Sequence, residues 1–161
     1  MKKIALFILF FVSLAATAQS NSFTVSNNKL VWENVFISNE ANIPTLVARH
    51  TRLKITSSNT AIFKGTGTEL RNSCPGTSAF LKGSFSFDFE IEVSDGKYRV
   101  TITNLIFNKT KKKGSKNTNA EVYLIKDGNL LSDETAQADL TCLDNYFNKI
   151  FTMTMLYKNR S

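Results

Sequence analysis

His50 is the only histidine in the chain, so any site that needs an imidazole has to use it. Ser-His-Asp and Cys-His hydrolases need such a base to take the proton of the nucleophile. His50 follows Ile43, Leu46 and Val47 at helical spacing, which places it on the apolar side of a short predicted helix. No positioned catalytic partner is indicated beside it. We therefore interpret His50 as a half-buried structural residue, with a small secreted hydrolase as the alternative.

A second candidate is a stripe of three carboxylates, Asp88, Glu90 and Glu92, which alternate with apolar residues. Residues two apart on a strand share a face and lie about 7 Å apart, because each residue rises about 3.3 Å. Carboxylates at that spacing are suited to Ca²⁺ binding or to acid–base work. The neighbouring strand offers Arg99 and Thr101 as partners. We therefore expect a solvated outer strand face without metal or cofactor, and keep this carboxylate stripe as the second centre of the hydrolase alternative.

Two further pairs carry weaker signals. Gly65 and Gly67 lack the third glycine and the following helix of a phosphate-binding loop, so they predict a turn or bulge at a strand end.

Cys74 and Cys142 are the only cysteines, and they lack metal-site spacing. They can pair in an oxidising compartment or remain buried thiols. Both interpretations stay open, because the sequence does not show how far apart their Cα atoms lie.

The strongest surface feature is a run of lysines without an acid, called the lysine segment below: Lys109, Lys111, Lys112, Lys113 and Lys116. The whole chain carries +7, and removing Lys2 and Lys3 with the N-terminal segment leaves +5, which equals the charge of the lysine segment. The segment is either a solvated loop, since like charges repel, or a contact for an anionic envelope component or another envelope protein. No aromatic residue interleaves with these lysines to stack bases, so specific nucleic-acid recognition is not expected.

The N-terminus has the pattern of a cleavable export signal. Lys2 and Lys3 precede an apolar run over residues 4–14, and Ala16-Thr17-Ala18 is typical of a cleavage site. The run is too short to span a bilayer, which needs about 20 residues. We predict a signal peptide over 1–18, a disordered segment over 19–28 and one α+β domain over 29–161. The mature chain should be periplasmic or extracellular, without a transmembrane segment.

The periodicity of the domain predicts strands over 29–37, 61–66, 84–93, 97–102 and 120–125, a loop over 68–77, and a short helix over about 43–53. A long helix should follow Ser132, which we expect to cap it. The apolar stripe of this helix runs from Ala136 to Phe151. The order predicts an α+β fold, with an antiparallel meander sheet and one short and one long helix packed on one face.

Asp95-Gly96 predicts a two-residue hairpin turn between the predicted strands over 84–93 and 97–102. The turn sets a register that can be tested on both faces of the hairpin. The predicted pairs are Ser94 with Lys97, Val93 with Tyr98, Ile91 with Val100, Phe89 with Ile102, and Glu92 with Arg99. Apolar residues then face apolar ones, and opposite charges meet on the other face.

Three segments carry a resemblance to a known family: KLVWENVF over 29–36, FKGTG over 63–67 and FDFEIEVSDGKYRVTITNLIF over 87–107. They resemble a family of uncharacterised secreted Bacteroidota proteins, a domain of unknown function with a TATA-binding-protein-like fold. The resemblance implies a β-α-β(4)-α order and brings no functional residue with it. The lysine segment and Cys74 are local features of this chain. The name of the fold does not imply that this chain binds DNA, because one fold can support many unrelated functions.

The residues support a non-enzymatic binding or structural module of the bacterial envelope, since a structural role accounts for each residue type that could do chemistry. The alternative is a small secreted hydrolase that uses His50 or the carboxylate stripe. A pocket that holds His50 beside a Ser or Asp would favour the hydrolase. An outward sheet face without such a pocket would favour the binding module.

Overall fold

The computed structural model describes residues 22–38, 42–108 and 117–152. The strands are β1 (Phe23–Ser26), β2 (Lys29–Ile37), β3 (Leu53–Ser58), β4 (Ile62–Arg71), β5 (Ser84–Ser94), β6 (Lys97–Asn108), β7 (Thr118–Asn119), β8 (Ile125–Lys126) and β9 (Asn129–Leu130). The helices are α1 (Ile43–Ala48), the short 3-10 helix η1 (Ala79–Lys82), α2 (Glu121–Leu124) and α3 (Glu134–Phe151). The predicted signal peptide and the lysine segment lie outside the described residues.

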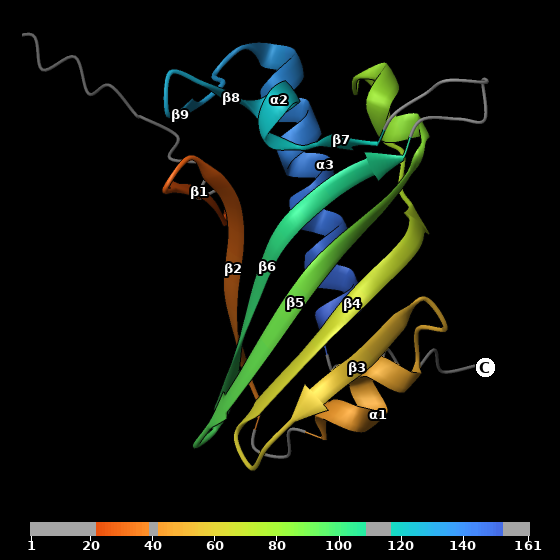
Figure 1. Cartoon of the computed structure of the whole chain (residues 1–161), viewed down its shortest axis with the longest axis vertical. Helices are drawn as coiled ribbons and strands as arrows, with labels where there is room; N and C mark the ends of the chain where they lie inside the picture. The colour runs from red at the N-terminus through yellow and green to blue at the C-terminus, as the bar shows by residue number, and fades with distance from the viewer. Residues whose placement is uncertain (1–21, 39–41, 109–116, 153–161) are drawn as a thin grey trace, which may run out of the picture.

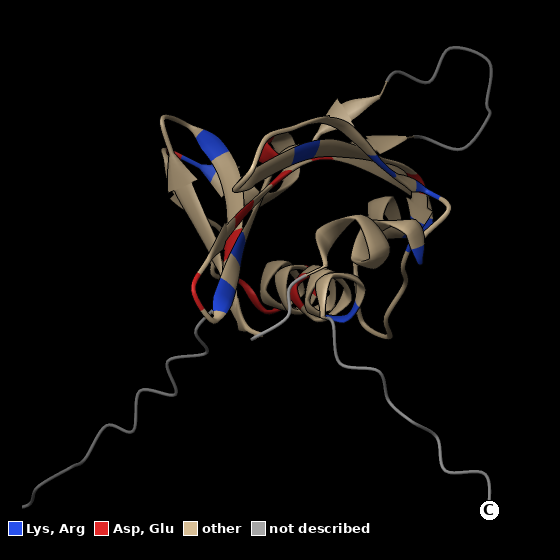
Figure 2. Cartoon of the chain, turned by 90° about the horizontal axis from the view of Figure 1, so that it is seen from below, with Lys and Arg blue, Asp and Glu red and all other residues tan. Residues whose placement is uncertain are grey.

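Antiparallel pairing joins seven strands into one sheet with the order β1-β2-β6-β5-β4-β3, and β7 pairs with the end of β6. The long helix α3 runs along one face of this sheet, and α1 lies beside β3 (Figure 1). Seen end-on, the sheet curves around the helices (Figure 2). The predicted α+β class, with an antiparallel sheet and helices on one face, is confirmed.

The core lies between the sheet and α3. Phe85, Phe87 and Phe89 alternate along β5 and point to the same face. The rings of Phe85 and Phe87 lie 6.2 and 5.2 Å from the ring of Phe147, and the ring of Phe89 lies 5.5 Å from that of Phe151. These edge-on contacts explain why α3 follows the direction of the central strands, because aromatic pairs stabilise beyond the area they bury.

The predicted hairpin register is confirmed at every pair, from Ser94↔Lys97 to Phe89↔Ile102, with Glu92 opposite Arg99. Gly96 in the turn has a φ of 68°, a left-handed conformation that glycine adopts without steric cost. The alternating side chains of β5 therefore divide into a buried row that contacts α3 and a polar row on the outer face of the sheet.

The predicted disordered segment over 19–28 is wrong for its described part. Residues 23–26 form β1, which pairs with β2 from Phe23↔Trp32 to Ser26↔Lys29. Asn27 and Asn28 both have positive φ and make the turn between the two strands. Phe23 is only 4% exposed, so burial of a single ring against the core contributes to ordering a short, polar segment.

Other boundaries also differ from the sequence-based prediction, and the strand predicted over 97–102 continues to Asn108 as β6. The predicted helix over 43–53 ends at Ala48, and Leu53 instead begins β3. The strand predicted over 61–66 continues to Arg71 through a bulge, so the following loop starts later. Most of the segment predicted as a strand over 120–125 is instead the helix α2. Its residues favour strands, but a long-range contact favours the helix, because Leu30 N donates a hydrogen bond to Glu121 Oε1 (3.3 Å). The last helix is capped by Asp133 rather than by Ser132.

Candidate functional site

The loop between β4 and η1 is held firmly against α3. Cys74 and Cys142 form a disulfide with their Cα atoms 6.0 Å apart. Asn72 Nδ2 donates to the backbone oxygen of Cys142 (3.0 Å). Asp139, which is 1% exposed, accepts the Ser78 N–H with Oδ1 (2.7 Å), directly before η1 begins. These contacts fix the position of η1 relative to α3.

The position of η1 creates an apolar pocket of about 570 Å³ at the end of β6. The residues that line this aromatic pocket come from η1, the residue that follows it, the end of β6 and α2: Ala79, Phe80, Lys82, Gly83, Phe107, Asn108 and Tyr123. The rings of Phe80 and Tyr123 stack 4.3 Å apart, and that of Phe107 lies 4.8 Å from the ring of Phe80. Its volume and apolar lining are those of pockets that take small ligands.

Gly83 allows the edge of the aromatic pocket to close tightly. A Cβ added at Gly83 would lie 2.6 Å from the backbone oxygen of Asn108, closer than real contacts allow. Ser84 pairs with Asn108 across the sheet, and Asn108 Nδ2 donates to Ser84 Oγ (3.3 Å). A glycine is therefore required where η1 passes into β5.

Lys82 places a positive charge at the rim of the aromatic pocket. Lys82 is exposed and lines it. The lysine segment follows Asn108 directly in the chain, and the described chain resumes just before Thr118, which pairs with Phe107. Both ends of the connection that carries the lysine segment are therefore attached at the pocket.

His50 follows α1 and is half-buried near the end of α3. Burial is the main cause that lowers the pKa of His50, and the nearby cations Arg49 and Lys149 lower it further. A hydrogen bond with the backbone of Ile150 opposes this shift. A catalytic histidine needs a carboxylate or a nucleophile to work with, whereas the charges acting on His50 are positive.

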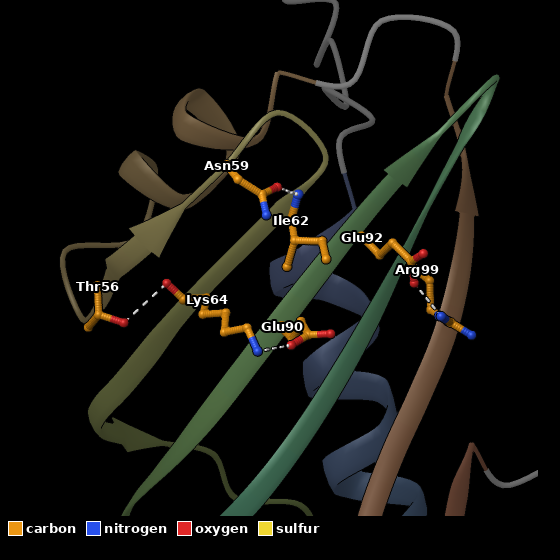
Figure 3. A network of polar contacts seen from close by, with 7 residues as sticks. All are labelled: Thr56, Asn59, Ile62, Lys64, Glu90, Glu92 and Arg99. Atoms are coloured by element: carbon orange, nitrogen blue, oxygen red, sulfur yellow. Dashed lines mark hydrogen bonds and ion pairs between the residues drawn. The ribbon is translucent and has the colours of Figure 1, made fainter.

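Each of the three carboxylates in the carboxylate stripe contacts a different partner on a neighbouring strand. Lys64 Nζ lies 2.6 Å from Glu90 Oε2, and Arg99 forms an ion pair with Glu92 (Figure 3). Asp88 Oδ2 instead accepts a hydrogen bond from Asn104 Nδ2 (2.7 Å). Among the described residues, no group of three or more His, Cys, Asp or Glu side chains is placed to hold a metal ion. The stripe lies on the outer face of the sheet and is bridged to neighbouring strands.

The strand order, the curved antiparallel sheet and the helix that it surrounds define an α+β protein of the TATA-binding-protein-like class. A solved TBP-like protein from Parabacteroides distasonis ATCC 8503 has a TM-score of 0.53 at 11% sequence identity. The match covers 80% of this chain and 94% of that protein. The TBP-like fold that the sequence resemblance implies is therefore confirmed.

A DUF4468 family protein from Bacteroides ovatus ATCC 8483 is also similar, with a TM-score of 0.49 at 14% identity, over 81% of this chain and 86% of that protein. The amino-acid sequence matches no protein-family model and no curated protein. The structural likenesses concern the fold alone, so function has to be argued from the residues of this chain. Within the described residues, no helix is long and apolar enough to cross a membrane.

The sequence did not point to the aromatic pocket. Phe80, Phe107 and Tyr123 come from three separate segments, and no spacing or motif in the sequence links them. Their convergence depends on the fold of the loop that the disulfide and Asp139 hold. The one available signal was the phenylalanine excess, since 13 phenylalanines exceed what the alternating row of β5 and the stripe of α3 use.

Proposed function

We propose that the chain is an exported, non-enzymatic binding module of the bacterial envelope and that its aromatic pocket takes an anionic amphiphile. The observation that carries the proposal is the apolar lining of this pocket with Lys82 at its rim. The apolar part of a ligand would contact Phe80, Phe107 and Tyr123. Its anionic group would be attracted to Lys82 and to the lysine segment, which is attached beside the pocket.

Export is part of the proposal and rests on the signal-peptide pattern over residues 1–18. The disulfide between Cys74 and Cys142 supports it, because such bonds persist in the periplasm and outside the cell but rarely in the cytosol. The hydrolase alternative is weaker, because cations surround His50 and because separate partners hold the carboxylates.

The proposal is tested by calorimetric titration of the mature chain with three probes. These are dodecyl phosphate below its micelle concentration, dodecyl maltoside as a neutral amphiphile, and inorganic phosphate as an anion without an apolar part. Dodecyl phosphate should bind most tightly, and its affinity should fall with added salt. Equal binding of the maltoside would contradict the anionic part of the proposal, and equal binding of phosphate would contradict the role of the pocket.

Two triple variants separate local charge from total charge. Changing Lys111, Lys112 and Lys113 to Gln should weaken dodecyl phosphate binding about 100-fold at low salt, because each lysine near an anionic surface contributes about 1 kcal/mol. The matched control changes Lys29, Lys54 and Lys97 to Gln, which removes the same charge from exposed positions outside the pocket. Equal loss in both variants would show that total charge, rather than the lysine segment, attracts the ligand.

The aromatic lining has its own test. Phe80→Ala should weaken binding of dodecyl phosphate at least tenfold and leave the far-ultraviolet circular dichroism unchanged, because η1 is held by Asp139 and the disulfide rather than by Phe80 alone. The matched control is Ile37→Ala, which removes an exposed apolar side chain at the last residue of β2, outside the aromatic pocket. The same loss in Ile37→Ala would show that the aromatic pocket is not where the apolar part binds.

A further inference from the structure

A tight turn presents one half of the disulfide at the surface. Cys74 is partly exposed, and Ser73, Pro75 and Gly76 around it are exposed. Thr77 Oγ1 donates to the backbone oxygen of Cys74 (2.7 Å), and Gly76 has a φ of 77°, so the chain turns directly after the cysteine. A Cβ added at Gly76 would meet no atom within 4 Å beyond its chain neighbours, so the space beside this turn is open.

The other half of the disulfide is buried. Cys142 lies in the middle of α3 and is 2% exposed. A nucleophile from solvent therefore approaches the bond on the side of Cys74, because the packing around α3 keeps it away from Cys142. Access of this kind helps to decide which sulfur of a disulfide is attacked.

A groove of about 330 Å³ lies against the bond. Cys74 and Pro75 line it from the turn, and Cys142 and four further residues of α3 line the other side. None of these lining residues is Asp, Glu, Lys or Arg, so an approaching thiolate meets no charge of its own sign in the lining. A volume of this size accommodates a small molecule.

Asn72 provides a hydrogen-bond donor for the sulfur that would leave. Its Nδ2 lies 3.2 Å from Cys142 Sγ and 4.0 Å from Cys74 Sγ. The same nitrogen donates to the backbone oxygen of Cys142 (3.0 Å), which holds the amide in this place. A hydrogen bond to a charged group stabilises that charge, so Asn72 offsets part of the cost of a thiolate at the buried Cys142.

We propose that the disulfide is a site of reversible modification, in which the thiolate of a small thiol compound attacks Cys74 Sγ. A bond forms between the incoming sulfur and Cys74 Sγ, and the bond between Cys74 Sγ and Cys142 Sγ breaks. The electron pair of the broken bond goes to Cys142, whose thiolate accepts the Asn72 N–H and then takes a proton from water. The incoming sulfur is oxidised to the disulfide level and Cys142 is reduced, so no further oxidant is required.

The modification releases the turn and leaves other contacts between the loop and α3 in place. Asn72 still donates to the backbone of Cys142, and Asp139 still accepts the Ser78 N–H (2.7 Å). The fold therefore survives the step, and attack by Cys142 on the mixed disulfide restores the original bond. The proposal concerns the bond itself, so it does not depend on the ligand proposed for the aromatic pocket.

The test treats the folded, disulfide-bonded mature chain with an excess of reduced glutathione, without denaturant. After acid quenching at early times and alkylation, peptide mass spectrometry should find glutathione on Cys74 and the alkyl group on Cys142. An adduct mainly on Cys142, or no adduct in the folded chain, would overturn the proposal. Reduction by thioredoxin, a protein dithiol, without any reaction with glutathione would overturn the assignment to a small thiol.

The variant Asn72→Ala separates stabilisation of the leaving sulfur from a structural role. It should form the Cys74 adduct about tenfold more slowly, as loss of a hydrogen bond to a charged group does. A residue that only holds the loop would have the opposite effect, because its removal loosens the turn, so an equal or faster rate would overturn the role of Asn72. Ser73→Ala, in the same exposed turn, is the control and should react at the wild-type rate. Should Asn72→Ala not fold, the position of the adduct in wild type still tests the site.

Discussion

Phe89 and Phe87 lie directly over the backbone of the neighbouring strand, and this explains two glycines. A Cβ added at Gly65 would lie 2.3 Å from both Lys54 O and the Phe89 ring, and one at Gly67 would lie 2.7 Å from the Phe87 ring. The two glycines are therefore sites of close approach between ring and backbone. Gly67 also lies where β4 enters its bulge; the sequence predicted a turn or bulge at a strand end, but β4 continues beyond it to Arg71.

Neighbouring residues on β5 should differ sharply in their contribution to stability. Phe89→Ala removes a ring that is 3% exposed and should lower the free energy of unfolding by about 3–5 kcal/mol, through lost burial and a cavity. Glu90→Ala removes an exposed ion pair with Lys64 and should cost less than about 1 kcal/mol. Chemical denaturation of both variants is the measurement. Similar losses would contradict the assignment of the two residues to opposite faces.

His50 should make stability depend on pH. Burial lowers the pKa of His50 in the folded chain below the ordinary value of 6.5, so the unfolded chain takes up the proton first. The free energy of unfolding should be constant above about pH 7 and should fall as pH drops through 6.5 toward the lower folded pKa. Urea denaturation between pH 7.5 and 5.5 measures this, in a range where carboxylates, with pKa values near 4, contribute little.

His50→Gln is the control for this pH dependence, because it removes the only imidazole in the chain. The variant should show a nearly flat free energy of unfolding over the same range. If wild type and His50→Gln lose stability in parallel as pH falls, the dependence comes from other groups, and His50 is not held in its neutral form by burial.

At the level of elements, β2 and α3 are joined by a chain of polar contacts beside the aromatic core. Trp32 Nε1 donates to Asp144 Oδ1 (2.8 Å), and Asn148 Nδ2 donates to Asp144 Oδ2 (3.0 Å). Tyr98 on β6 donates its hydroxyl to the backbone oxygen of Phe151 at the end of the helix (2.6 Å). These contacts fix where α3 lies along the sheet, which apolar packing alone specifies less sharply.

The disulfide should matter to both stability and the aromatic pocket. Its cysteines are 68 residues apart, and closing a loop of that length contributes about 4 kcal/mol in the chain-entropy model. Replacing Cys74 and Cys142 with Ser should lower the free energy of unfolding by up to that amount. The double variant should also weaken ligand binding at the aromatic pocket, because the bond holds the loop that leads to η1.

Denaturation of the double Ser variant beside wild type under oxidising conditions measures the effect, and intact mass under alkylation shows whether the bond forms in exported protein. Ser73 is exposed and next to Cys74, so Ser73→Ala is a matched control in the same loop. Two alkylated cysteines in protein exported by its own signal would contradict the disulfide.

At the level of the whole molecule, the charges are unevenly divided between its surfaces. Blue basic and red acidic segments are interspersed along the described strands (Figure 2), and Lys64 and Arg99 each pair with a glutamate. Among the residues that line the aromatic pocket, Lys82 is the one charged side chain.

The N-terminal segment over residues 1–18 should be removed when the protein is exported. Expressed with its own N-terminus in a bacterium of the Bacteroidota, the exported protein should begin at Gln19 and should have lost both Lys2 and Lys3. N-terminal sequencing and intact mass of the extracytoplasmic fraction measure this. A variant with Ala16 and Ala18 changed to Arg should accumulate uncleaved, and full-length wild type in the cytoplasm would contradict export.

The sequence by itself determined the elements whose signals are local. The ten-residue alternation of β5, the Asp95-Gly96 turn and the apolar stripe of α3 each depend on neighbouring residues. They predicted the hairpin register and the α+β class correctly. Period-two and helical patterns are strong in these long elements because one face of each is buried over its whole length.

Only the tertiary structure decided the short elements and the pockets. β1 is ordered through the burial of Phe23, and α2 is helical despite strand-like residues because it begins beside Leu105 and bonds Leu30 through Glu121. The aromatic pocket unites three segments that lie far apart in the sequence. Long-range contacts of this kind decide the conformation of short segments, since the burial of a few side chains outweighs a weak local preference.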